Sequence, residues 1–181
     1  MKVEDMIQDA LAKSWNFFKK QYVVLIVGGL IATIGSIFII TAPPLYFGLF
    51  FIAWNIVDGK KVEISDVFKG FNYFIVSWIM LILYLIAIIL GLIFFVLPGL
   101  VLMILFQYAV AVAIAEKKGA VDSLKRSYRL AMDNFVFSLI FALIMWIING
   151  IGGALQIGWV ITCPFSVLAT CVAYKKLALK K

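Results

Sequence analysis

The stretch from Phe74 to Ala115 contains no Asp, Glu, Lys or Arg, and the chain has no His anywhere. A charge-free run of about forty residues cannot belong to a soluble core, because about a quarter of the residues of soluble proteins are charged. Two long apolar segments make up the run, and Leu97-Pro98-Gly99-Leu100 joins them. We read the run as a transmembrane helical hairpin with a tight turn at Pro98 and Gly99. The same unit recurs, less regularly, before and after it.

Composition places the whole chain in the same class. Of its 181 residues, 65% are hydrophobic and 14% are charged, against about 45–50% and 25% in soluble proteins. These values predict an all-α integral membrane protein, a single membrane domain over residues 1–181 with no separate soluble domain. The two cysteines, Cys163 and Cys171, lie two helical turns apart in the last apolar run, so we expect buried apolar fillers and no disulfide.

The charged residues alternate along the chain. All sixteen Lys and Arg and all nine Asp and Glu fall at the termini and on alternate connectors, whereas the connectors around Pro43 and Pro44, at 97–100 and at 149–153 are uncharged. Because basic connectors stay in the cytoplasm, we predict a multi-pass protein of the cell membrane with six transmembrane helices and both termini cytoplasmic. The predicted spans are Tyr22–Ile40, Pro44–Val57, Phe74–Val96, the run ending at Ala115, the run from Phe135 to about Asn149, and the run ending near Tyr174.

The second predicted span is short. Pro44 to Val57 is 14 residues, about 21 Å of helix, while the hydrocarbon core of a bilayer is about 30 Å thick. Full crossing then requires an extended helix or a thinner bilayer. The alternative is that some hairpins re-enter without crossing, in which case protein must cover their turns.

A segment of mixed polar and apolar residues with helical period precedes each pair of spans. We expect three amphipathic helices at the cytoplasmic interface, with Ser65 as N-cap of the second and Asp122 as N-cap of the third. Their apolar faces have two possible partners, the lipid or the helix bundle. The residues of these faces include Met6, Ile7, Ala10, Phe17 and Phe18 in the first, Ile64, Val67, Phe68 and Phe71 in the second, and Val121, Leu124, Tyr128, Ala131 and Phe135 in the third.

Three lysine doublets indicate an internal triplication. Lys60-Lys61, Lys117-Lys118 and Lys175-Lys176 each close a unit of interfacial helix, span, turn and span, at spacings of 57 and 58 residues. Three units of one orientation, at about 1–61, 62–118 and 119–181, suggest a pseudo-threefold axis along the membrane normal. The third unit departs from the pattern, since its turn is rich in glycine and Pro164 is expected to kink its last helix.

Four short motifs carry a resemblance to a known group of proteins. They are Val67-Phe68-Lys69-Gly70-Phe71, Leu97-Pro98-Gly99-Leu100, Asp122-Ser123-Leu124-Lys125-Arg126-Ser127 and Thr162-Cys163-Pro164-Phe165. With them the chain resembles an uncharacterised family of bacterial and archaeal multi-spanning membrane proteins related to the membrane domain of glycerophosphodiester phosphodiesterases. In the fused relatives the catalysis belongs to a separate soluble domain. The resemblance therefore implies a membrane module and no esterase activity.

The apolar runs hold no group suited to catalysis. None contains an ionisable acid, base or His, no nucleophile stands beside a base, and no metal-ligand set is present. We therefore predict a protein that is not an enzyme, with no catalytic residue, cofactor or metal. Uncharged polar residues do occur within the runs, among them Ser36, Gln107 and Asn149. They fit either interhelical hydrogen bonds or the lining of a pore.

These observations favour a non-enzymatic membrane module that anchors, scaffolds or self-assembles. Its basic cytoplasmic face would bind anionic lipid headgroups or acidic partners, and we expect a homo-oligomer and no nucleic acid. The alternative function is a pore or carrier for ions, lipids or small apolar molecules. The alternative role of the basic residues is to set the topology alone. The residues expected to contact headgroups are Lys117, Lys118, Lys125, Arg126 and Arg129.

Overall fold

The computed structural model describes residues 3–94, 96–155 and 158–179. Helix makes up 90% of the structure, and no strand occurs among the residues described. Six helical segments are long and apolar enough to cross a membrane, which indicates an integral membrane protein and is consistent with a multi-pass one. The helices are α1 (Val3–Gly35), the short 3-10 helix η1 (Ile39–Thr41), α2 (Ala42–Val57), the 3-10 helix η2 (Ile64–Tyr73), α3 (Phe74–Phe94), α4 (Val96–Phe106), α5 (Ala109–Glu116), α6 (Ala120–Asp133), α7 (Phe135–Ala154) and α8 (Trp159–Ala178).

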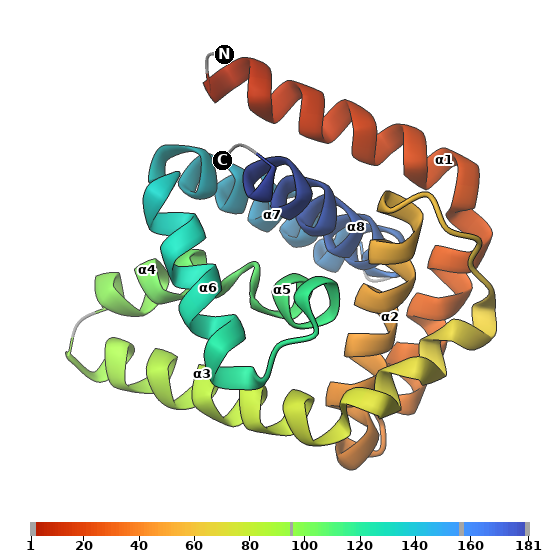
Figure 1. The fold of residues 1–181 in the computed structure, drawn as a ribbon, viewed down its shortest axis with the longest axis horizontal. Helices are drawn as coiled ribbons and strands as arrows, with labels where there is room; N and C mark the ends of the chain where they lie inside the picture. The colour runs from red at the N-terminus through yellow and green to blue at the C-terminus, as the bar shows by residue number, and fades with distance from the viewer. Residues whose placement is uncertain (1–2, 95, 156–157, 180–181) are drawn as a thin grey trace.

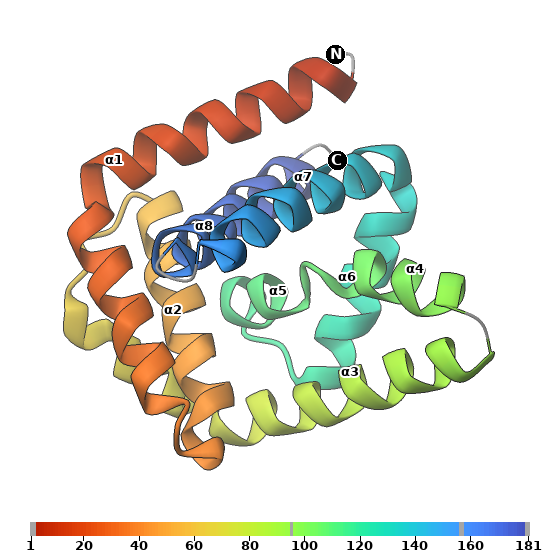
Figure 2. The ribbon, with the colours of Figure 1, turned by 180° about the vertical axis from the view of Figure 1, so that it is seen from behind.

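The long helices form three contacting pairs, α1 with α2, α3 with α4, and α7 with α8. The pairs do not run side by side (Figures 1 and 2). In Figure 1, α3 follows the lower edge of the molecule, α2 rises on the right, and α7 and α8 pass obliquely across the upper centre. The three pairs therefore point in different directions, and helices of all three meet in the middle of the molecule.

α1 joins the first mixed segment and the first apolar run in one helix. A bend at Gln21, with φ −128° and ψ 22°, separates the two parts. In the first part Met6, Ala10 and Phe18 are buried, and the Phe18 ring lies 5.7 Å from the ring of Phe165 on α8. This apolar face therefore packs on the protein.

η2 packs along α2 through glycine. A methyl group on Gly48 would collide with the carbonyl oxygen of Val67, and one on Gly70 would collide with the carbonyl oxygen of Pro44. Residues without side chains allow two backbones to approach this closely. The glycine in the motif Val67–Phe71 is therefore required by the packing of η2 on α2.

Both predicted N-caps are wrong. η2 is capped by Glu63, whose N–H donates to the Asp66 carboxylate at 2.9 Å while the Glu63 side chain accepts from the Asp66 N–H. This reciprocal capping box takes the place of a cap by Ser65. The N-cap of α6 is Gly119, and Asp122 lies in the first turn, where a carboxylate faces the positive end of the helix dipole.

The fourth apolar run, Leu97–Glu116, is long and apolar enough to cross a membrane, and it contains a break between two helices. α4 ends at Phe106 and α5 begins at Ala109. Ser127 of α6 fills the break: its buried hydroxyl donates to the carbonyl oxygen of Leu105 at 2.8 Å and accepts from the Tyr108 N–H at 3.2 Å. Backbone groups freed inside a membrane need such partners, because no water replaces them.

The turns also differ from those predicted. Pro43 and Pro44 lie in the first turn of α2, and Pro98 and Gly99 lie in the first turn of α4. Proline suits this position, because the first N–H groups of a helix have no partner within it. The glycine-rich stretch 149–153 is helical and belongs to α7.

α8 continues as one helix through Pro164, where the sequence predicts a kink. The proline is buried, and its ring packs against Gly29 of α1, which has no side chain to collide with it. The α1–α8 contact therefore accommodates the proline at a glycine.

The outer side of α3 is a continuous apolar stripe. The stripe repeats every three or four residues, while Ser77 and Met80 between its members are buried. So large an exposed apolar surface is typical of contact with lipid. The exposed members are Ile75, Ile79, Ile82, Ile86, Ile89 and Ile93.

Candidate functional site

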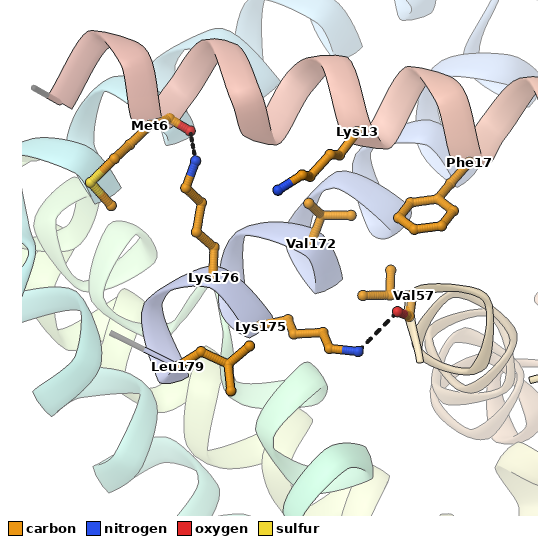
Figure 3. Close-up of a pocket in the computed structure, with 8 residues that line it drawn as sticks. All are labelled: Met6, Lys13, Phe17, Val57, Val172, Lys175, Lys176 and Leu179. Atoms are coloured by element: carbon orange, nitrogen blue, oxygen red, sulfur yellow. Dashed lines mark hydrogen bonds between the residues drawn. The ribbon is translucent and has the colours of Figure 1, made fainter. Parts of the chain in front are cut away.

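A pocket of about 390 Å³ lies between the first part of α1, the end of α2 and the end of α8 (Figure 3). Its volume is in the range of small-molecule sites. Three lysines line it, Lys13 from α1 and Lys175 and Lys176 from α8. The other lining residues are apolar: Met6, Phe17, Val57, Val172 and Leu179.

Lys176 joins the two ends of the chain. Its ammonium donates to the backbone carbonyl oxygen of Met6 at 2.9 Å and to the carboxylate of Asp9 at 2.7 Å. Asp9 also accepts from Lys13 at 2.9 Å. One carboxylate thus holds two lysines at the rim of the pocket, and the last turn of α8 is fixed against α1.

Lys175 makes the matching contact with the end of α2. Its ammonium donates to the carbonyl oxygen of Val57 at 3.0 Å and to Asp58 at 3.2 Å, and it lies 5.8 Å from the centre of the Trp54 ring. Asp58 also pairs with Lys60 at 2.9 Å. The hydrogen bonds from Lys60 and then from Lys175 lower the pKa of the Asp58 carboxyl below its usual value, so it stays ionised at neutral pH.

The electrostatics of the pocket favour an anion. Two carboxylates, Asp9 and Asp58, are shared among four ammonium groups, so the cluster keeps a net positive charge. Apolar walls stand directly beside these ammonium groups. An amphiphile with an anionic head and an apolar body matches both features, because lysine binds phosphate as a point charge.

The five predicted headgroup residues separate into two groups. Glu116 pairs with Lys118 at 2.5 Å and with Arg126 at 3.3 Å, and it also accepts from the Tyr174 hydroxyl at 2.8 Å. These contacts join the end of α5 to α6 and α8. Lys118 and Arg126 therefore have a structural partner within the protein.

Lys117, Lys125 and Arg129 are exposed, and no ion pair is recorded for them within the part of the chain that the structure describes. Lys117 ends α5 in the left-handed conformation, with φ 51°. Lys125 and Arg129 lie on the outer side of α6. They are the predicted headgroup residues that remain available to an external anion.

α6 presents small buried residues on one side and a mixed apolar and basic surface on the other. The small residues Ser123 and Ser127 face the protein and are buried. Val121, Tyr128 and Met132 form an exposed apolar strip, so the apolar face predicted for this helix is divided between protein and surface. The basic side chains follow this strip along the helix. A helix of this kind fits the boundary between protein, lipid and water.

The three polar residues singled out within the apolar runs, Gln107, Asn149 and Ser36, all have partners. Gln107 donates to the carbonyl oxygens of Ile104 and Ser138, at 2.9 and 3.1 Å. Asn149 donates to the Ser166 hydroxyl at 2.7 Å, which links α7 to α8. The Ser36 hydroxyl donates to the Ala32 carbonyl oxygen at 2.6 Å. Gln107 and Asn149 thus make interhelical hydrogen bonds, and Ser36 bonds within its own helix end.

A second cavity, of about 360 Å³, lies among all three helix pairs. Aromatic and aliphatic side chains dominate its lining, with Tyr46 from α2, Tyr84 from α3 and Trp146 from α7. Gln107 and Thr170 add polar groups. The cavity is therefore suited to a mainly apolar molecule.

The sequence did not single out the first pocket. Lys13 lies far from Lys175 and Lys176 in the chain, and the three meet because α8 returns to α1. In the sequence, the doublet Lys175-Lys176 indicated only the internal repeat and no binding site. Among the described residues, no group of three His, Cys, Asp or Glu side chains comes together. Comparisons of the chain with models of protein families, with curated proteins and with solved structures gave no match.

Proposed function

We propose that this protein is a non-enzymatic membrane module that binds anionic lipid headgroups at its basic face. The observation that carries the proposal is the pocket in which Lys13, Lys175 and Lys176 stand beside apolar walls. A lipid phosphate would meet the ammonium groups while the start of its acyl chains meets Phe17 and Val172. Lys125 and Arg129 on α6 extend the same face.

Three similar contacts support the predicted triplication and a scaffold role. η2 of the second unit packs on α2 of the first, α6 of the third packs on α4 and α5 of the second, and the first part of α1 packs on α8 of the third. Gly48 contacts Gly70 in the first of these interfaces, and Leu105 contacts Ser127 in the second. Leu105 lies 57 positions after Gly48, and Ser127 lies 57 positions after Gly70. The first two lysine doublets have the same spacing. We infer a pseudo-threefold repeat that closes on itself, as a rigid module requires.

Lipid retention tests the proposed function. The protein is placed in nanodiscs of equal phosphatidylglycerol and phosphatidylcholine, and native mass spectrometry counts the lipids that remain bound after release. We expect enrichment of phosphatidylglycerol, and a loss of about thirtyfold in that enrichment for Lys13→Gln/Lys175→Gln, because each of the two lysines near anionic lipid contributes about 1 kcal/mol.

Lys19→Gln/Lys20→Gln is the matched control. It removes the same charge from exposed positions of α1 outside the pocket, so the enrichment should persist. A third variant, Lys125→Gln/Arg129→Gln, measures how much α6 contributes to the phosphatidylglycerol enrichment. Equal retention by the wild type and the pocket variant would reject the pocket as a headgroup site.

A second candidate function is a carrier for lipids or small apolar molecules. The cavity among the three helix pairs favours it, because that cavity is apolar and is lined from every pair. A carrier of an uncharged or apolar molecule needs no charged residue inside the membrane, in contrast to ion-coupled carriers.

A further inference from the structure

The tip of the first helix pair is strongly apolar. It comprises Ile37, Phe38, Ile39 and Ile40, whose side chains are between 66% and 76% exposed. A turn that emerges into water usually carries polar residues. Four consecutive large apolar side chains instead indicate a surface that contacts an apolar medium.

The backbone of this tip is largely satisfied from within the protein. The Ile37 and Phe38 N–H groups donate to carbonyl oxygens one turn earlier, both at 3.2 Å. The Thr41 hydroxyl lies 2.5 Å from the Gly35 carbonyl oxygen. The Trp78 indole N–H donates to the Ile40 carbonyl oxygen at 3.2 Å. A turn in hydrocarbon needs such internal partners, whereas a turn in water does not.

The position of η2 places the middle of α2 near a charged surface. The Lys69 ammonium lies 5.6 Å from the centre of the Phe51 ring, near the middle of α2. Lys69 is 54% exposed and pairs with Asp66 at 2.7 Å. If α2 crossed the membrane, this exposed ammonium would lie deep in the hydrocarbon, which is strongly unfavourable. The middle of α2 therefore lies at headgroup depth.

The straight helical parts of the first pair, counted without the part of α1 before its bend and without the tip, are shorter than the hydrocarbon layer is thick. The part of α1 after the bend at Gln21 is 14 residues and α2 is 16 residues, about 21 Å and 24 Å against a hydrocarbon thickness of about 30 Å. Gly70 also contacts Pro44 near the tip, so η2 lies beside the first half of α2.

We propose that the tip at 37–40 is an interaction surface for the acyl chains of the bilayer. The first pair enters from the side that carries Lys60 and Lys61, turns within the hydrocarbon, and returns without emerging on the other side. Its partner is the lipid hydrocarbon itself. Both ends of the pair remain on one side, as the charge pattern requires.

Depth measurement tests this proposal. Spin labels are attached at Phe38→Cys and, as a matched position partway along the same pair, at Leu30→Cys, and the protein is reconstituted in phosphatidylcholine vesicles. Both side chains are exposed, so neither change should disturb packing. Collision rates with oxygen and with a water-soluble nickel chelate then give the depth of each label. We expect Phe38 to be deeper than Leu30, with several-fold higher oxygen than nickel collision rates.

The opposite order, with Leu30 deeper and Phe38 accessible to nickel, would show that the pair crosses and would overturn the proposal. Low collision rates with both reagents at Phe38 would show that protein covers the tip, which also overturns it. Ile39→Cys provides a second reporter at the tip if Phe38→Cys does not fold. Unmodified protein corrects for labelling of Cys163 and Cys171. Headgroup binding does not enter this readout, so its outcome is independent of the proposed function.

Discussion

At the scale of single residues, the decisive side chains are small polar ones in the apolar interior. Ser127 matters most, because it supplies both partners that the break between α4 and α5 needs. Replacing Ser127 with Ala leaves the Tyr108 N–H and the Leu105 carbonyl group without that partner. We expect a loss of about 1–3 kcal/mol in the free energy of unfolding, measured by denaturant titration in detergent micelles.

Ser14→Ala is the matched control for this change. Ser14 is equally buried, but its hydroxyl donates to the Ala10 carbonyl oxygen of its own helix turn, at 2.7 Å. That carbonyl already accepts a backbone bond within α1, so the loss should be small. Equal effects of the two changes would contradict the role assigned to Ser127.

At the scale of helices, the contact between α2 and η2 has the closest backbone approach. A methyl group at Gly48 has no space, because the carbonyl oxygen of Val67 occupies its position. Gly48→Ala should therefore separate the two helices and lower the thermal midpoint, at a cost of about 1–3 kcal/mol or more. Circular dichroism in micelles measures the midpoint.

Gly150→Ala is the comparison within the apolar helices. No atom lies near enough to Gly150 to meet the added methyl group, and Ala is favoured over Gly inside a helix by up to about 1 kcal/mol. We expect no loss of stability for it. If Gly48→Ala were equally harmless, the close approach of η2 to α2 would be wrong.

At the scale of the whole molecule, the three pairs line the second cavity, and the carrier hypothesis depends on it. Val110→Phe would fill the cavity, whereas Val136→Phe adds the same bulk on the exposed side of α7. The carrier hypothesis predicts transbilayer movement of a fluorescent phospholipid in proteoliposomes, slowed several-fold by Val110→Phe and unchanged by Val136→Phe. Movement that does not depend on the protein would remove this hypothesis. Native mass spectrometry also tests the homo-oligomer, which stays a prediction.

The sequence by itself determined the class and the placement of charge. Six long apolar helices could be predicted for two reasons. A helix satisfies its backbone hydrogen bonds internally, as hydrocarbon requires, and the transfer of charged residues into hydrocarbon is unfavourable. These constraints act on composition and spacing, which are local properties of a chain. Helix ends were predicted less well. Ser65 is a residue type favoured at N-caps, but Glu63 caps η2 and Gly119 caps α6. The backbone geometry decides which of several neighbouring residues takes the N-cap position.

Only the tertiary structure decided which faces are buried and which residues meet. The apolar runs are hydrophobic on every side, so no period marks the exposed stripe of α3. In α6 a period did predict an apolar face, but only the structure shows that Leu124 and Ala131 of that face are buried while Val121 and Tyr128 are exposed. The break in the fourth run is bridged by Ser127, which comes from another helix. Lys13 and Lys176 likewise share Asp9 only because α8 returns to α1. Such contacts depend on how helices distant in the chain pack together, which spacing along the chain does not specify.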